Sequence, residues 1–171
     1  MEDPPSDEEC VKAIREALGK LVTDGLLPYN VVENGGFLRE LALFKDRRRR
    51  VDPGENADET ARNKADEKAL RAVLEAAVED EEISGKHRRL LRAVLPLNEE
   101  HVGKSIKERR VAAGKDLKPG KKAVTAGTIR NHYEPRALEK LAAVLGRMEL
   151  EFRAKAPSSR GGPADSEGSD S

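Results

Sequence analysis

The chain contains 171 residues, of which 37% are charged, 37% are hydrophobic and only 3% are aromatic, and its formal net charge is zero. This composition is typical of a small all-α protein with an aliphatic core, and it argues against a β-sandwich or barrel, which needs many β-branched and aromatic segments. No apolar run reaches the length of a membrane span, and the acidic N-terminus lacks the apolar region of a secretory signal. We therefore expect a cytoplasmic protein that does not associate with membranes.

The first part of the chain predicts two helices after an acidic lead-in. Residues 1–9 are rich in Asp, Glu and Pro and are expected to be disordered. Residues 10–50 are expected to form an N-terminal helical pair, with Gly25 as the C-cap of the first helix and the turn Asn34-Gly35-Gly36 before the second. The apolar residues with helical spacing are Val11, Ile14, Leu18 and Leu21, followed by Phe37, Leu38, Leu41 and Phe44.

The rest of the chain predicts a second helical unit. Residues 51–57 contain adjacent Pro and Gly among polar residues and are expected to be a linker. Residues 58–154 are expected to form a helical domain, and residues 155–171, rich in Ser, Gly and Asp, a disordered tail. The whole fold is predicted to be a small bundle of about six helices whose C-terminal half resembles a helix-turn-helix.

Charge is distributed unevenly along the chain despite the zero total. Residues 55–82 hold ten acidic and four basic residues, whereas residues 101–137 hold ten basic and three acidic residues. Such asymmetry has two interpretations, a surface that binds a polyanion or an acidic helix that covers the basic segment. The sequence leaves both open.

The basic segment has the order of elements that a helix-turn-helix requires. Ser105 and Glu108 have the spacing of a capping box at a helix start. This helix is expected to end at Gly114 and to be followed by a basic loop, with a second short helix from near Thr125 and a new start at Pro135.

Nine residues of this segment are candidates for nucleic-acid binding. The polar side chains at the start of the second helix could reach base edges, and the flanking basic side chains could bind phosphates. The candidates for base contact are Thr125, Thr128, Arg130 and Asn131, and the candidates for phosphate contact are Arg109, Arg110, Lys118, Lys121 and Lys122. A structural role remains the alternative, in which Arg109, Arg110 and Arg130 pair with Glu134, Glu139 or the acidic helix.

The residues Thr128-Ile129-Arg130-Asn131-His132-Tyr133-Glu134 resemble the Thr-Ile-Arg-x-Tyr-Glu stretch of mercury-resistance-regulator (MerR-like) winged helix-turn-helix proteins. The resemblance implies that the stretch belongs to a recognition helix whose Arg and Tyr contact the DNA backbone. This chain departs from the pattern by one extra residue before the Tyr and by Pro135 after the Glu.

A broader pattern is similar to a helical segment of actinobacterial proteins of unassigned role. It spans about 60 residues and comprises Leu90 to Leu95, Ser105, Arg109-Arg110, Ala112-Ala113, Thr128 to Arg130, Glu134, Leu138 and Leu141-Ala142. This resemblance implies a regulatory interaction module that accompanies varied partners.

The sequence offers little for catalysis or metal binding. Cys10 is the single cysteine, and His87, His101 and His132 lack the paired spacing of a metal site. No Gly-x-Ser-x-Gly motif is present. We expect no enzyme activity, cofactor, metal or small-molecule substrate. The sequence predicts a non-enzymatic cytoplasmic regulatory module that binds nucleic acid through its basic segment, and the alternative is a protein–protein interaction adaptor in a signalling or regulatory assembly.

Overall fold

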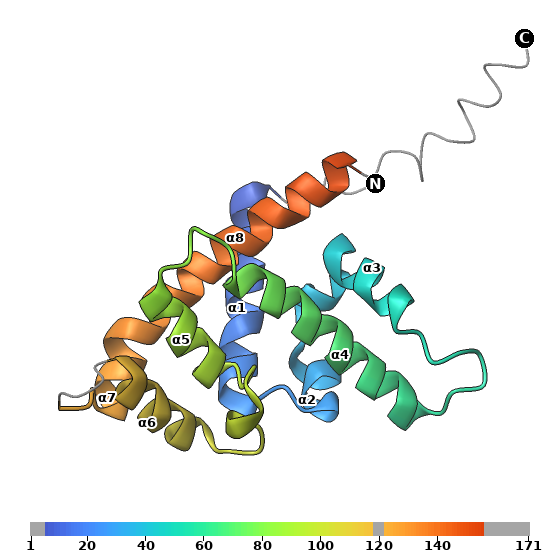
Figure 1. Ribbon diagram of the computed structural model, residues 1–171. Coiled ribbons are helices and arrows are strands. Elements are labelled where there is room, and N and C mark those ends of the chain that lie inside the picture. Colours follow the sequence, from blue (N-terminus) through green and yellow to red (C-terminus); the bar gives the residue numbers. More distant parts are fainter. Residues whose placement is uncertain (1–5, 118–121, 156–171) are drawn as a thin grey trace, which may run out of the picture.

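A computed structural model describes residues 6–117 and 122–155, which form an all-α fold without strands (Figure 1). Residues 126–155 form one continuous helix, because α7, a π turn and α8 follow one another without a break. The α-helices are α1 (Asp7–Asp24), α2 (Pro28–Asn34), α3 (Ala42–Arg50), α4 (Glu59–Val78), α5 (Gly85–Val94), α6 (Ile106–Leu117), α7 (Ala126–Thr128) and α8 (Glu134–Lys155). The short turns are η1 (Gly36–Glu40), η2 (Glu99–His101) and the π turn η3 (Ile129–Tyr133).

The helix α8, which is the main part of the long helix 126–155, makes contacts with most of the other helices. It lies along α1 and also contacts α3, α4 and α5, while α2 and α3 pack on α4, and α5 packs on α6 (Figure 1). The crossing of α1 and α8 is close at Gly146, where an added Cβ would lie 2.8 Å from the Cγ2 atom of Val11. A larger residue at this position would push the two helices apart.

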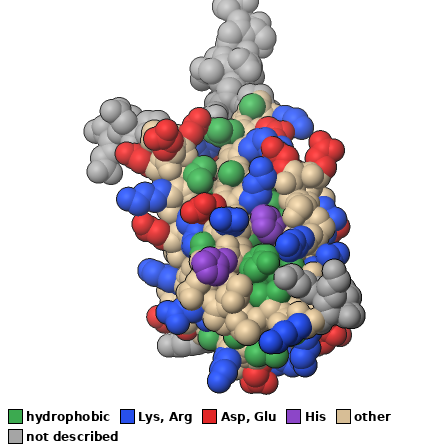
Figure 2. Space-filling model, turned by 90° about the vertical axis from the view of Figure 1, so that its left-hand side faces the viewer, with side chains coloured by type: hydrophobic (Ala, Val, Ile, Leu, Met, Phe, Trp, Pro, Cys, Tyr) green, Lys and Arg blue, Asp and Glu red, His purple; other side chains and the backbone are tan. Residues whose placement is uncertain are grey.

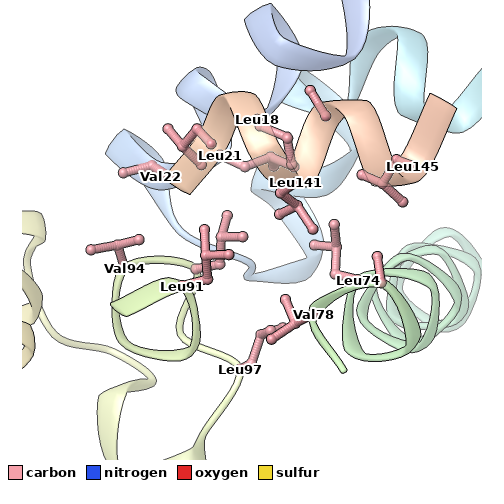
Figure 3. Packing of buried hydrophobic residues seen from close by; sticks show 14 of the residues in the cluster. Leu18, Leu21, Val22, Leu74, Val78, Leu91, Val94, Leu97, Leu141 and Leu145 are labelled. Atoms are coloured by element: carbon pink, nitrogen blue, oxygen red, sulfur yellow. The ribbon is translucent and has the colours of Figure 1, made fainter. Parts of the chain in front are cut away.

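One hydrophobic core joins the two ends of the sequence (Figure 3). Leu18 and Leu21 of α1 meet Leu141 of α8, and Leu74 and Leu91 close the core from α4 and α5. All five leucines are fully buried. Because residues before and after 51–57 share this core, the predicted linker is a loop between two packed helices, and residues 10–50 do not form a separate unit.

Helix boundaries confirm some predictions and correct others near the N-terminus. Gly25 is the C-cap of α1 with a φ of 91°, as predicted. The predicted lead-in is too long, because α1 begins at Asp7, with a capping box formed by the N-cap Ser6 and Glu9 in the first turn. Residues 1–5 lie outside the described part. The helix α2 was not predicted; it starts at Pro28, in the first-turn position where the missing N–H of proline leaves no hydrogen bond unmade.

The second predicted helix of the pair is divided. Residues 36–40 form the turn η1, Leu41 is extended with a ψ of 140°, and α3 starts at Ala42. The division is stabilised by Glu149 of α8, whose buried carboxylate accepts the N–H groups of Ala42 at 2.8 Å and Leu43 at 3.1 Å. N–H groups in the first turn of a helix have no acceptor within the helix. Glu149, which is far away in the sequence, supplies one and so fixes where α3 begins.

The acidic helix does not cover the basic segment. Its carboxylates pair with arginines of α3, α5 and α8: Asp66 with Arg48 at 2.6 Å, Glu79 with Arg92 at 2.5 Å and Asp80 with Arg147 at 2.5 Å are examples. Within residues 6–117 and 122–155, no ion pair joins residues 55–82 to residues 101–137. The interpretation of the charge asymmetry as an intramolecular match is therefore wrong for the part of the chain that the structure describes.

Candidate nucleic-acid interface

The helix α6 and the start of the long helix are held together at the loop between them. Ser105 and Glu108 form the predicted capping box, with both hydrogen bonds at 3.2 Å. The helix does not end at Gly114 as predicted, but continues to Leu117. Gly114 has another role, because the N–H of Val124 donates to its carbonyl at 3.2 Å and an added Cβ would clash with the Val124 carbonyl.

The second helix begins where the sequence predicts it. Thr125 is the N-cap of α7, and its hydroxyl accepts the N–H of Thr128 at 3.2 Å. Its hydroxyl also donates to Thr128 Oγ1 at 3.0 Å. The Thr125 side chain therefore fixes the helix start, and this use competes with the predicted base contact.

Pro135 lies in the first turn of α8, where the sequence predicts a helix start, but α8 continues from the π turn without a break in the helix. In a regular α-helix its ring would collide with the carbonyl of Asn131, four residues earlier. The chain instead forms the π turn η3, in which the N–H of Glu134 donates to the carbonyl of Ile129, five residues earlier. The wider turn lets Ile129 and Glu134 both be buried, although five-residue spacing would place them on different faces of an α-helix.

The predicted base-contact and loop residues have different surroundings. Arg130 and Asn131 in η3 are exposed, and so are Thr125 and Lys122 just before the helix, whereas Thr128 is half-buried. Lys118 and Lys121 lie outside the described residues. The structure thus places four of the predicted side chains at the surface around the start of the long helix.

Arg109 does not belong to this surface, and its prediction as a phosphate contact is wrong. Its side chain is only 2% exposed. The guanidinium donates to the backbone carbonyls of Val94, of Lys104 at 3.1 Å and of Thr23 at 3.4 Å. Burial, with a smaller contribution from Arg110, lowers the pKa of this guanidinium. All of its hydrogen bonding is directed inward, so it cannot reach a phosphate.

Arg110 is engaged by a buried carboxylate. Its Nε and Nη2 atoms donate to the two oxygens of Glu134, each at 2.9 Å. This bidentate pair joins α6 to the long helix directly after the π turn. The structural alternative weighed for Arg110 is therefore observed, and a phosphate could reach this guanidinium only by competing with Glu134.

Beside the start of the long helix lies a hollow that the sequence did not predict. It has a volume of about 460 Å³ and is lined by Lys86 and His87 of α5, Thr128 of α7, His132 and Tyr133 of η3 and Arg136 of α8. Figure 2 faces this end of the molecule and shows histidine side chains among lysine and arginine side chains. We call this set of residues the basic hollow.

Positive charge dominates the basic hollow. The pKa of His87 is lowered, mainly by burial and further by the positive charges of Lys86, Lys140 and Arg136. The ammonium of Lys86 lies 4.9 Å from the centre of the Tyr133 ring, a cation–π arrangement that orders both side chains. Among the described residues that line the hollow, none carries a carboxylate. The electrostatic potential at His87 is therefore positive, because no carboxylate in the lining offsets the neighbouring cations.

The remaining cations of the basic segment also lack acidic partners. Among the described residues, Arg110 is the one basic residue of positions 104–136 that forms an ion pair. The others that the structure describes are Lys104, Lys107, Lys115, Lys122, Arg130 and Arg136. Most arginines outside this segment pair with carboxylates, whereas Arg130 and Arg136 form no ion pair among the described residues.

Other kinds of site are not evident in the part of the chain that the structure describes. In these residues, no group of three or more His, Cys, Asp and Glu side chains is placed to hold a metal ion. None of the described helices is both long and apolar enough to cross a membrane. Comparisons with protein-family models, curated proteins and solved structures returned no match. Inference about function therefore rests on the geometry of this chain.

Proposed function

We propose that this chain is a non-enzymatic regulatory module that binds nucleic acid at its basic end. The basic end comprises the exposed residues around the start of the long helix: Lys86, Lys122, Arg130, Asn131, His132 and Arg136. The observation that carries the proposal is the clustering of exposed cations at one end, where Arg130 and Arg136 form no ion pair among the described residues although most other arginines of the fold do. Unpaired Lys and Arg side chains supply the phosphate contacts on which nucleic-acid affinity depends.

The contacts of α6 with the long helix support a division of roles within the proposed site. The helix α6 and its bidentate pair to Glu134 hold the start of the long helix in place. Arg130 and Asn131 project from that start, and their side chains are of the types that pair with guanine and adenine edges in the major groove. Lys122, just before α7, would bind the phosphate backbone. Thr125 contributes through the helix cap and not through base contact.

The adaptor function remains the second candidate because of a hollow on the opposite part of the long helix. This hollow has a volume of about 240 Å³ and is lined in part by Val11, Phe37 and Leu150. Leu150 is 49% exposed and lies beside the partly buried Val11 and Phe37, so the three form an apolar part of the lining. An apolar side chain of a partner protein would fit such a surface.

Salt-dependent binding to duplex DNA tests the proposal. The affinity of the full chain for a mixed-sequence duplex is measured by fluorescence anisotropy at several salt concentrations. We expect affinity to fall steeply with salt and to be weaker in Lys122→Gln/Arg130→Gln. The slope of log affinity against log salt should be smaller by about 1 for each phosphate that the variant no longer neutralises.

The matched control is Lys20→Gln/Lys68→Gln, which removes the same charge from exposed positions on α1 and α4. If both double variants weaken binding equally, the effect is one of total charge and the basic end is not the site. Absence of binding by the wild-type chain at low salt would contradict the proposed function and favour the adaptor.

A further inference from the structure

The basic hollow brings together hydrogen-bond donors from two segments that are far apart in the sequence. Lys86 and His87 come from the first turn of α5, while Thr128, Tyr133 and Arg136 come from the long helix. Lys86 and Arg136 are cationic, Thr128 and Tyr133 carry hydroxyl groups, and imidazole nitrogens donate when protonated. The chemistry of the lining is therefore that of an anion receptor with several donor types.

The electrostatics of the basic hollow have the same sign throughout. The closest carboxylate in the sequence, Glu134, is buried and holds Arg110 with both oxygens, so it does not neutralise the lining. The ten-residue helix α5 begins at Gly85, beside the hollow, and its N-terminal end adds partial positive charge. Lys86, Arg136 and protonated His87 around one hollow repel one another. A bound anion would offset this repulsion.

The size and the donors of the hollow suit a phosphoryl group. A volume of about 460 Å³ is larger than a single small ion needs, and it leaves room for the group to which a phosphate is attached. Arginine donates two N–H groups in a planar fork that matches two phosphate oxygens, and lysine and hydroxyl groups donate to the others.

We propose that the basic hollow binds a phosphoryl group, held by Arg136 and Lys86 with the hydroxyls of Thr128 and Tyr133, and that this group is a backbone phosphate of bound nucleic acid. The second part of this proposal rests on the proposed function, whereas the first part does not. The hollow then adds an anchor on α5 to the contacts of the helix-turn-helix-like segment. Such an anchor would fix how the long helix lies on the duplex.

Binding of an anion is coupled to a proton at His87. The charged and titratable groups around this imidazole are Lys86 from α5, His132 and Tyr133 from η3, and Arg136 and Lys140 from α8. In the free protein burial and the cations lower the pKa of His87, whereas a bound anion would raise it. Anion binding should therefore tighten as the pH falls through the range in which His87 takes up its proton.

The test follows the imidazole resonances of His87 and His132 by NMR in the full chain. Sulfate serves as the probe because it is a tetrahedral oxyanion that does not titrate in this pH range, and chloride keeps the ionic strength constant. We expect saturable shifts and an upward movement of the His87 titration midpoint with sulfate. Lys86→Gln/Arg136→Gln should weaken sulfate binding about tenfold or more, because it removes both fixed charges. Lys20→Gln/Lys68→Gln should bind as the wild type does.

A second arm measures duplex DNA binding of the same variants. Loss of sulfate binding together with weaker DNA binding in Lys86→Gln/Arg136→Gln supports both parts of the proposal. Sulfate binding in the hollow with unchanged DNA affinity in the variant overturns the assignment to nucleic acid and identifies a site for a small phosphorylated molecule. Sulfate effects equal to those of chloride, or equal in the two double variants, overturn the hollow as a phosphoryl site. The Lys122→Gln/Arg130→Gln comparison judges the proposed function separately.

Discussion

Arg109 joins three parts of the fold through a single guanidinium. Its acceptors lie near the end of α1, at the end of α5 and just before α6. The carbonyls of Thr23 and Val94 lie in the last turns of their helices, where carbonyl groups lack partners within the helix, and the carbonyl of Lys104 lies in the loop before α6. A long side chain with five donors can satisfy several of them at once, which a shorter or neutral residue cannot do.

Replacing Arg109 should therefore destabilise the fold strongly. Arg109→Ala leaves carbonyls without donors in a buried place and opens a cavity, so we expect the free energy of unfolding to fall by about 3 kcal/mol. Urea denaturation followed by circular dichroism measures this change. Arg130→Ala, which removes an exposed arginine, should change the free energy of unfolding by less than about 0.5 kcal/mol. Equal effects of the two substitutions would contradict the role assigned to Arg109.

The sequence could not show which of the arginines in this segment is buried. Arg109, Arg110 and Arg130 have the same chemistry and lie in one basic segment, and burial depends on which helix ends surround the residue in space. The capping residues Ser105 and Thr125 were predictable because their hydrogen bonds are local. Arg109 depends on Thr23, 86 residues earlier, and no local signal contains that information.

At the scale of elements, the loop between α6 and α7 is tied to the helix that precedes it. The hydrogen bond from Val124 to the Gly114 carbonyl brings the end of the loop back onto α6. An added Cβ at Gly114 would lie 3.0 Å from the Val124 carbonyl carbon and closer still to its oxygen. Glycine is needed here for close approach of two backbone segments and not for an unusual φ.

Gly114→Ala should consequently move the start of the long helix. The clash with backbone leaves only a shift of the loop, so we expect a loss of about 1–3 kcal/mol in the free energy of unfolding and weaker DNA binding. Gly127→Ala is the matched control, because its Cβ would meet nothing within 4 Å and alanine favours the helix. The melting temperatures and anisotropy measurements of both variants test this. A Gly114→Ala protein as stable as Gly127→Ala would show that the loop is not tied to α6.

The π turn explains how Pro135 can lie in the first turn of α8 while the helix continues through it from α7. Pro135 predicted a new helix start, because proline is acceptable only in the first turn of a regular helix. The structure instead accommodates Pro135 with a five-residue turn, in which the N–H of Glu134 donates to the carbonyl of Ile129. Two buried residues at five-residue spacing, Ile129 and Glu134, indicate a π turn. The sequence does not show that Glu134 is buried, so this indication is available only from the structure.

At the scale of the whole molecule, the predicted all-α class is confirmed and the division into units is not. Composition and helical periodicity suffice for the class, since they depend on local preferences. The division failed because Pro and Gly at 51–57 mark only a turn, whereas the sharing of a core between α1 and α8 is a long-range property. The basic hollow was missed for the same reason, since Lys86 and Arg136 lie far apart in the sequence.

The shared core predicts that the chain folds as one unit. A fragment of residues 58–155 lacks Ile14, Leu18 and Leu21, whose burial contributes about 1.5–3 kcal/mol each. We expect the full chain to show a single unfolding transition, with coincident midpoints by circular dichroism and by NMR. The fragment should bind the dye ANS and lack a cooperative transition. A cooperatively folded fragment would restore the two-unit interpretation.

Arginine and lysine perform different tasks in this fold. Arginines form nearly all of its ion pairs, and among the described residues Lys45, 3.7 Å from Glu40, is the only lysine in one. Acetylation neutralises lysine and leaves arginine unchanged. Enzymatic or chemical acetylation would therefore remove charge from the basic end at Lys86 and Lys122 while every arginine contact that holds the helices together remained in place.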